Sequence, residues 1–350
     1  GLSEELRDGG SMVVNLWEEG GERDVANQLG RVVGANVSAA ARQPELLARF
    51  FSCNPGHCAT TNPRFFIENV RAALAPGEFY FNRTSKQLFV WPLANWTAGA
   101  HRIGDSFVVP TLDRLVSING SSGVSFSNIS FADTTYRASG GDGELDGPAG
   151  DPSDAAVRIN FASAVRITGC HFGAGIGGYA VAVGNRSVGV RVQGCLIEDV
   201  GQGGVIMYGA GPPAHDPSHA VDNRPRDAVV SHNLFRRIGY VLKSVAAVLM
   251  KSAHGCVIAH NAIIDSPRAA IELDTTNMDL GPYYTPHVSR DNLVQHNVIR
   301  GACLEANDCG AIYAYGGGFP DKMRWDLNNS FIYNNSEMAM LSRFVFCPSR

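Results

Sequence analysis

Five similar segments in the second half of the chain bring groups capable of acid–base chemistry into one column. The segments are residues 179–185, 203–209, 246–252, 269–275 and 310–316, and each is rich in small and β-branched residues. Strand side chains alternate between faces, so positions four and six of each segment are predicted to point away from positions three and five. The sixth position holds Gly184, Tyr208, Lys251, Asp274 and Tyr315.

Two carboxylates on the fourth of these segments have a spacing suited to glycoside hydrolysis. Glu272 and Asp274 are two residues apart, which is about 6.6 Å along a strand. That separation lies near the lower edge of the range for the acid and base of an inverting glycosidase. Lys251 beside Asp274 is expected to keep that carboxylate ionised. The alternative is a solvated strand face with an ordinary Lys–Asp cross-strand pair.

Aromatic and basic residues around these carboxylates are candidates for substrate binding. Tyr208 and Tyr315 offer ring faces on which sugars can stack, and Tyr313 stands at position four of its segment. Lys251 and Arg268 supply positive charge close to the acids. We therefore expect these five side chains to contact a saccharide.

A second acidic pair competes with the first. Glu305 and Asp308 lie just before the fifth segment, at the turn that leads into it. They could cap that turn through Asx-type bonds, supply a catalytic acid, or bind Ca²⁺. The number of residues along the strand places them well away from Asp274, so the two pairs are alternative catalytic pairs for one reaction.

The remaining columns predict which face of these strands is buried. Positions three and five are apolar in every segment, which indicates a core face. The first three members of position four are apolar as well, so we expect another segment, such as the N-terminal region, to cover them. Position three holds Val181, Val205, Val248, Ile271 and Ile312; position five holds Val183, Met207, Met250, Leu273 and Ala314; position four holds Ala182, Ile206, Leu249, Glu272 and Tyr313.

A second repeated unit supports a solenoid. A short run ending in Phe or Ile recurs every 25 to 40 residues or so, the range of solenoid repeats. Its second residue, which we expect to stack from coil to coil as a buried ladder, is Cys170, Cys195, Asn233, Asn261 and Asn297. The preceding histidines, His232, His260 and His296, are interpreted as a surface column, with metal binding as the lesser alternative. The fold class is therefore all-β, a right-handed parallel β-helix with a small N-terminal region that contains a β-hairpin.

The domain organisation follows from where this repetition begins. Residues 1–115 do not repeat and form an irregular β region, whereas residues 116–350 form the β-helix. Within the first part, residues 78–91 predict a β-hairpin, because two apolar-aromatic stretches flank a polar turn. Residues 43–51 predict a short helix.

Composition limits the partners and the location of the chain. The net charge is −4 with acids and bases interspersed, which argues against a nucleic-acid-binding surface. No apolar run is long enough to span a membrane.

The cysteines form two closely spaced pairs, Cys53 with Cys58 and Cys303 with Cys309, which are spaced for short disulfide loops or are free buried thiols. Frequent glycosylation sequons favour a secreted protein. The sequons begin at Asn36, Asn82, Asn95, Asn119, Asn128, Asn185, Asn328 and Asn334.

Several stretches resemble one group of right-handed β-helix proteins. APGEFYFN at 75–82 with QLFVWP at 87–92 resembles the hairpin that precedes the helix in that group, and CLEANDCGAIY at 303–313 resembles one of its later coils. The group includes the family 141 glycoside hydrolases, so the resemblance implies the pectate-lyase fold and fucosidase- or xylanase-type activity. It covers about residues 62–316. The group usually follows this coil with a Gly-Arg-Asp-Trp-like segment, where AYGGG stands here at 314–318.

Three functions are compatible with these features. The first is a secreted glycoside hydrolase acting on a cell-wall or matrix polysaccharide, with catalytic carboxylates drawn from Asp274, Glu272, Asp308 and Glu305. The second is a polysaccharide lyase in which Lys251 removes a proton and Arg268 neutralises a uronate. The third is a solenoid that binds a polysaccharide or oligosaccharide without cleaving it. No cofactor is expected, apart from the calcium alternative.

Overall fold

The computed structural model describes residues 13–17, 28–36, 45–50, 64–82, 84–93, 107–136, 155–209, 222–243, 245–274, 289–305, 309–315, 330–332 and 334–337. The chain divides into two compact units. The first is Gly1–Val109 with Ala138–Asp146, and the second is Pro110–Arg137 with Gly147–Arg350. Among the described residues, the first unit contains strands and one 3₁₀ helix, and the second contains strands. No helix in this part of the chain is long and apolar enough to cross a membrane.

The first unit contains a four-stranded antiparallel sheet and a hairpin. The sheet has the order β3-β2-β1-β4, and a register shift interrupts the pairing of β2 with β3 between Val32 and Gly34. The elements are β1 Val13–Trp17, β2 Gln28–Asn36, β3 Glu45–Phe50, β4 Arg64–Glu68, the 3₁₀ helix η1 Arg71–Ala73, β5 Phe79–Asn82 and β6 Gln87–Val90.

Two expectations for this unit have different outcomes. The hairpin is confirmed, since β5 pairs antiparallel with β6 and the Asn82 side chain accepts hydrogen bonds from the backbone of Thr84 and Ser85 in the turn. The helix expected at 43–51 is wrong. That segment forms strand β3, because pairing with β2 outweighs its local helix propensity.

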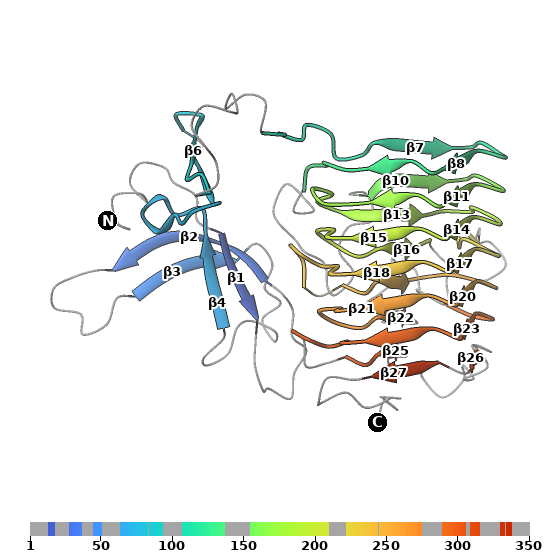
Figure 1. Ribbon diagram of the computed structural model, residues 1–350. Coiled ribbons are helices and arrows are strands. Elements are labelled where there is room, and N and C mark those ends of the chain that lie inside the picture. The colour runs from blue at the N-terminus through green and yellow to red at the C-terminus, as the bar shows by residue number, and fades with distance from the viewer. Residues whose placement is uncertain are drawn as a thin grey trace. The chain divides into compact units, whose positions relative to one another are not determined.

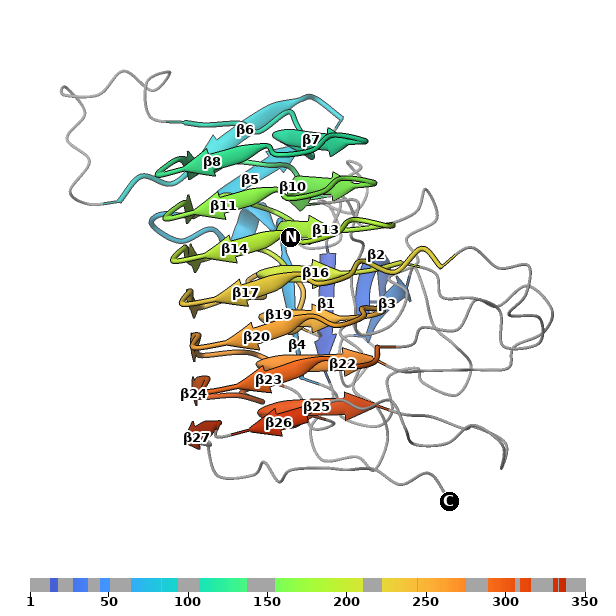
Figure 2. The same ribbon diagram turned by 90° about the vertical axis from the view of Figure 1, so that its right-hand side faces the viewer.

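The second unit is a parallel β-helix, which confirms the predicted fold class (Figure 1). Three seven-stranded sheets, here called sheets 1, 2 and 3, run the length of its described part, and each coil contributes one strand to each sheet. Figure 2 shows the coils stacked in chain order, from β7 to β27. Every pairing between successive coils is parallel, so residues at equivalent positions stack along the helix axis.

The three sheets have the following strands. Sheet 1 contains β7 Val116–Asn119, β10 Ala155–Asn160, β13 Tyr179–Val183, β16 Val205–Met207, β19 Val248–Met250, β22 Ile271–Asp274 and β25 Ile312–Tyr315. Sheet 2 contains β8 Ser125–Ser127, β11 Arg166–Thr168, β14 Arg191–Gln193, β17 Val229–Ser231, β20 Val257–Ala259, β23 Leu293–Gln295 and β26 Ser330–Ile332. Sheet 3 contains β9 Ser130–Phe131, β12 His171–Phe172, β15 Leu196–Glu198, β18 Leu234–Arg236, β21 Ala262–Ile264, β24 Val298–Arg300 and β27 Asn335–Glu337.

Apolar columns from the three sheets form the core. The predicted third and fifth columns of sheet 1 are confirmed in register, from Val181 to Ile312 and from Val183 to Ala314. Sheet 3 contributes a buried column whose first two rings, Phe131 and Phe172, are stacked with centroids 4.8 Å apart. Burial of these columns against the neighbouring coils is the main source of the solenoid's stability, because no coil has a core of its own.

A ladder of asparagines follows the turn between sheets 2 and 3. The amide of Asn261 donates to the Asn297 Oδ1 atom at 2.9 Å and to the Val230 carbonyl at 3.0 Å, and its own Oδ1 accepts from the backbone N–H of Asn233. Asn233 and Asn297 repeat the pattern, which confirms the predicted ladder. The ladder therefore pairs polar groups that would otherwise be buried without partners.

The ladder has one member that the sequence analysis missed. Asn334 accepts hydrogen bonds from the backbone and the amide of Asn297, and its own amide nitrogen donates to the Val294 carbonyl at 3.1 Å. The sequence predicts a glycosylation sequon at Asn334. Because the nitrogen that would carry a glycan is engaged in the ladder, this residue serves the fold instead.

The residue just before each ladder position has a left-handed backbone conformation. Glycine holds this position in two coils, and His232, His260 and His296 hold it in later ones with φ between 53° and 59°. The three exposed imidazoles stack with centroids 4.9 and 5.0 Å apart, which confirms the predicted surface column. Among the described residues, no group of three or more His, Cys, Asp or Glu side chains is arranged to hold a metal ion.

A charge cluster fixes the chain where it enters β17. The carboxylate of Asp222 accepts hydrogen bonds from the backbone and the guanidinium of Arg224, which is buried, and pairs with Arg226 at 3.0 Å. Burial alone would raise the pKa of Asp222. The hydrogen bonds and charges of the two arginines outweigh that effect and lower the pKa from its ordinary value of 3.8 to about 2.

We predict that Asn261→Ala strongly destabilises the protein. The change leaves the backbone N–H of Asn233 and the Val230 carbonyl without their side-chain partners in a buried position. The free energy of unfolding should fall by about 3 kcal/mol, since each unsatisfied buried group costs roughly 1–3 kcal/mol. Urea denaturation followed by far-UV circular dichroism measures this. His260→Asn is the matched control, because Asn tolerates the left-handed conformation of this exposed neighbour; equal losses in the two variants would contradict the prediction.

We predict that Asp222 makes the protein less stable in acid. A folded-state pKa below the ordinary value means that the stabilisation is present above about pH 4 and is lost as the pH falls toward 2. A shift from 3.8 to about 2 corresponds to about 2 kcal/mol. In urea titrations at pH 7 and pH 3, Asp222→Asn should lose stability mainly at pH 7. Asp265→Asn, which changes an exposed aspartate, should follow the wild type; a loss of the same size at both pH values would refute the role of Asp222.

Candidate functional site

Sheet 1 differs from its neighbours because its central strands are buried on both faces. Every residue of β13, β16 and β19 is buried, whereas strands of sheets 2 and 3 alternate between buried and more exposed positions. The predicted fourth column is confirmed in register, with Glu272 beside Leu249 on one side and Tyr313 on the other. Its apolar members are buried, as expected. Glu272 is 3% exposed and Tyr313 is also 3% exposed, so the column carries polar groups into a covered region.

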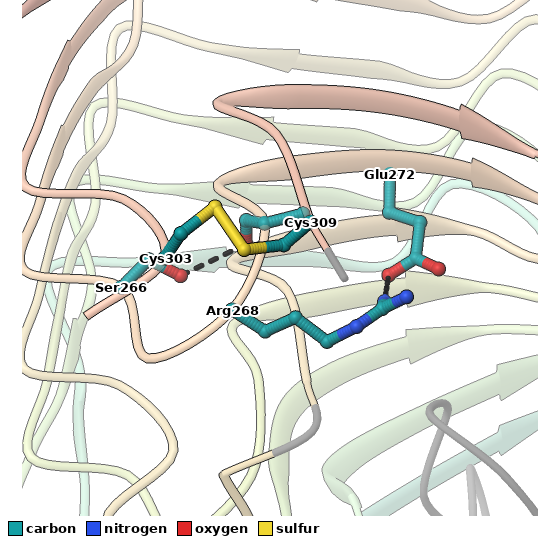
Figure 3. The surroundings of a disulfide bond; sticks show 6 residues. Ser266, Arg268, Glu272, Cys303 and Cys309 are labelled. Atoms are coloured by element: carbon teal, nitrogen blue, oxygen red, sulfur yellow. Dashed lines mark hydrogen bonds and ion pairs between the residues drawn. A yellow bond between two sulfur atoms is a disulfide. The ribbon is translucent and has the colours of Figure 1, made fainter. Parts of the chain in front are cut away.

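A buried ion pair occupies this column at the C-terminal end of the sheet. A guanidinium Nη1 of Arg268 donates to the Glu272 carboxylate, and both side chains are almost fully buried (Figure 3). The guanidinium also lies over the Tyr313 ring, 5.0 Å from its centroid. The structure thus brings together three residues that the sequence analysis had selected separately.

Tyr179 belongs to the same cluster and was missed as a site residue. It is fully buried, and burial first and the negative charge of Glu272 second raise its pKa far above the ordinary value. Its hydroxyl therefore remains protonated at neutral pH. A Cβ on Gly203 would lie 2.5 Å from the Tyr179 ring, so only glycine leaves room for the ring at that position. An aromatic residue at the start of the first aligned segment was the available signal.

A disulfide stabilises the turn next to this ion pair. Cys303 and Cys309 are bonded, which confirms one of the two predicted loops; Cys53 and Cys58 lie outside the described residues. The backbone N–H of Cys303 donates to the Arg268 carbonyl at 3.0 Å. The disulfide thus restrains the backbone on either side of the cluster, at Arg268 and in the turn that leads into β25.

The competing acidic pair has only one described member. Glu305 forms an ion pair with Lys243 at 3.2 Å, and its backbone N–H donates to the Pro267 carbonyl at 2.9 Å. These contacts attach the turn to Lys243 and Pro267, while the Asx-type capping by Glu305 stays a prediction. Asp308 lies outside the described residues, so its catalytic and calcium-binding roles stay predictions.

Tyr208 of the sixth column forms a second polar cluster nearer the N-terminal end of sheet 1. The Arg158 Nε donates to the Tyr208 hydroxyl at 3.0 Å, and that hydroxyl donates to the Asn160 Oδ1 at 3.0 Å. A Cβ on Gly184 would lie 2.5 Å from the Tyr208 ring and 2.0 Å from the Asn160 oxygen. Glycine in the intervening coil therefore allows Tyr208 to reach β10. Arg158 and Asn160 were missed because residues 155–160 were not aligned with the five later segments.

The remaining residues of the sixth column are placed by their backbone. Asp274 pairs in register with Tyr315, one coil beyond Lys251, as the alignment predicts. The backbone N–H of Lys251 donates to the Met207 carbonyl at 2.9 Å, and its side chain is half-buried. Lys251 forms no ion pair with any side chain that the structure describes. The substrate-binding roles of Tyr208, Lys251, Arg268, Tyr313 and Tyr315 stay predictions.

Comparisons with known proteins agree with the architecture. A family model described as right-handed β-helix region matches residues 155–342. A solved structure titled glycoside hydrolase matches with a TM-score of 0.63 and 17% identity, covering 94% of this chain and 66% of that protein. An alginate lyase from Paenibacillus sp. matches with a TM-score of 0.34 and 12% identity, covering 64% of this chain and 76% of that one. No curated protein matches the sequence. The likeness to the solved glycoside hydrolase concerns the fold alone.

We predict that Arg268 and Glu272 are strongly coupled energetically. Arg268→Met leaves the Glu272 carboxylate buried without this cation and should reduce the free energy of unfolding by about 3–5 kcal/mol. The double variant Arg268→Met/Glu272→Leu should recover most of that loss, because neither charge then remains. A double-mutant cycle by urea denaturation measures the coupling.

The control for this cycle is the exposed pair of Arg290 and Asp291. Arg290→Met should cause only a small loss, since exposed ion pairs contribute little. Additive losses in the Arg268 and Glu272 variants would show that the two charges do not depend on each other.

Proposed function

The chain belongs to the right-handed β-helix family, and we propose that it is a carbohydrate-active protein, specifically a glycoside hydrolase acting on a cell-wall or matrix polysaccharide. The observation that carries the proposal is the register of β22 and β25. It sets Glu272 beside Tyr313 and Asp274 beside Tyr315, so two carboxylates and two tyrosines occupy adjacent coils. The solved glycoside hydrolase named above supports the fold of this chain, whereas the chemistry rests on these residues.

Glu272 is the carboxylate of β22 whose side-chain surroundings the structure describes, and these surroundings suit the role of a base. Arg268 provides a positive charge in contact with Glu272, and an adjacent cation favours the ionised form of a carboxylate. An ionised carboxylate can act as a general base but cannot donate a proton. We therefore assign Glu272 as the base and Asp274, about 6.6 Å along the strand, as the acid. This assignment requires Asp274 to be protonated, so it replaces the expectation from the sequence that Lys251 keeps that carboxylate ionised.

The reaction follows from this assignment. The Asp274 carboxylic acid donates its proton to the glycosidic oxygen as the bond from that oxygen to the anomeric carbon breaks. Water attacks the anomeric carbon from the opposite face and gives its proton to the Glu272 carboxylate. Proton exchange with solvent then restores both groups, and the product has the inverted anomeric configuration.

Neighbouring residues support these roles. The Tyr313 ring lies over the Arg268 guanidinium and helps to hold it against Glu272. Burial strengthens the attraction between the two charges, because the surrounding dielectric is low. Arg268 is thus engaged by Glu272, whereas the lyase mechanism requires it for a uronate carboxylate. This contact favours hydrolysis over β-elimination.

Location outside the cell is part of the proposal. The Cys303–Cys309 disulfide supports it, since structural disulfides persist mainly in oxidising compartments. Two predicted sequons, Asn119 and Asn128, are exposed and could carry glycans, unlike Asn334. These features fit a secreted glycoprotein.

Hydrolysis is tested by incubating the protein with neutral and acidic polysaccharides and measuring new reducing ends. Ultraviolet absorbance of unsaturated uronates is recorded in parallel, because only a lyase produces it. Asp274→Asn and Glu272→Gln should each lower kcat by about a hundred-fold or more. NMR of the first product should show inversion.

The control for these variants is Asp291→Asn, which changes an exposed carboxylate just before β23 of sheet 2 and should keep wild-type activity. If Glu305→Gln loses hydrolytic activity and Asp274→Asn keeps it, the catalytic carboxylates are those of the competing pair, Glu305 and Asp308. Unsaturated products would establish a lyase instead. Binding without any product would leave a non-catalytic carbohydrate-binding solenoid.

A further inference from the structure

Arg158 is a half-buried cation on sheet 1 whose side-chain hydrogen-bond partner is a hydroxyl. Its Nε is held by the Tyr208 hydroxyl, which is in turn fixed by Asn160. It forms no ion pair with any described residue. A partly desolvated charge without a counter-charge is unfavourable, so such a position needs a reason beyond stability.

The geometry around Arg158 leaves its outer nitrogens for a ligand. Only the Nε hydrogen bonds to a side chain in the described part of the molecule, so both Nη groups retain their N–H donors. The Tyr208 ring reaches Arg158 across Gly184, where any larger residue would collide with it. The guanidinium is therefore held in one orientation before any ligand arrives, as pre-organised binding sites require.

The charges of sheet 1 are divided along the helix axis. Strands β7, β10, β13, β16 and β19 contain no Asp or Glu, and both carboxylates of the sheet lie in β22. Arg158 lies four coils before Glu272, which is about 19 Å at about 4.8 Å per coil. Lys251, directly after β19, adds a second half-buried cation between them. The half-buried residues of this edge, Arg158, Asn160, Tyr208 and Lys251, form what we call the cationic strip.

We propose that the cationic strip binds an anionic sugar unit of the substrate, with its carboxylate or sulfate on the Nη groups of Arg158. The inference rests on the proposed function and names its substrate class: an acidic polysaccharide long enough to extend about 19 Å from the carboxylates. A planar carboxylate suits two parallel N–H donors of a guanidinium. The Tyr208 ring beside it provides an apolar face for the sugar.

Isothermal titration calorimetry with a galacturonate octamer and its fully methyl-esterified form tests the charge directly. The two probes differ in the charge of the carboxyl group, so the galacturonate octamer should bind at least ten-fold more tightly than its ester. The difference in affinity should become smaller when salt is added. A sulfated galactan octamer is a third probe, which shows whether the strip prefers a carboxylate or a sulfate. Equal affinity for the ester and both anionic probes would overturn the proposal.

Variants assign the effect to Arg158. Arg158→Gln should reduce affinity for the preferred anionic probe at least ten-fold and leave affinity for the ester unchanged. Arg166→Gln is the matched control, because Arg166 is an exposed arginine on β11 of the same coil. Tyr208→Phe keeps the charge but removes the hydroxyl that orients it, and should weaken binding by a smaller factor. Equal affinities of the Arg158 and Arg166 variants would refute the assignment, and circular dichroism verifies folding.

The outcomes for binding and for hydrolysis are separable. Cleavage of neutral polysaccharides without preference for the anionic probes would overturn this inference and leave the proposed hydrolase intact. Arg158-dependent binding of an anionic probe without release of reducing ends would support the cationic strip and refute the hydrolase. Failure of both would reject both proposals.

Discussion

The parallel hydrogen bonding between successive coils determines what each side chain of the β-helix can contact. It places equivalent residues directly above one another at about 4.8 Å, so the side chains of one column must be able to lie in contact with one another. Apolar columns meet this requirement by packing, the asparagines by bonding along the axis, and His232, His260 and His296 by stacking their rings. Like charges stacked in one column repel each other. The few charged residues of sheet 1 therefore point to positions with a specific role.

The charged residues of sheet 1 are held differently from those on the exposed sheets. On sheet 3, the carboxylate of Glu198 contacts Arg236 and His171, and the hydrogen bond from Arg236 is the main cause of its lowered pKa. Water and salt can compensate charges at such a surface. On sheet 1, Glu272 is buried and depends on Arg268, while Arg158 has a hydroxyl as its partner. The proposed catalytic and binding roles both concern positions where a charge is costly.

The fold and its columns could be predicted because strand alternation and repetition act locally and are visible in the sequence. The same reasoning identified Glu272, Tyr313 and Arg268 but could not predict their contact, since Arg268 precedes its strand and reaches Glu272 through a bend. Arg158 was missed because residues 155–160, which have Arg and Asn where the next segment has Ala182 and Gly184, were not aligned with the later segments. The strand at 45–50 was missed for a different reason: its pairing partner, β2, lies outside the repeat, so no local pattern revealed it.

The asparagine ladder has a consequence for how the chain can change over evolution. Its successive members are separated by 28, 36 and 37 residues, although their side chains make the same contacts. Insertions between coils are therefore accommodated in the loops, provided that each asparagine returns to its place. Loss or duplication of part of a coil would instead shift every later asparagine out of alignment. New substrate specificities in such a protein should thus arise by lengthening loops, while the number of coils between Asn233 and Asn334 stays constant.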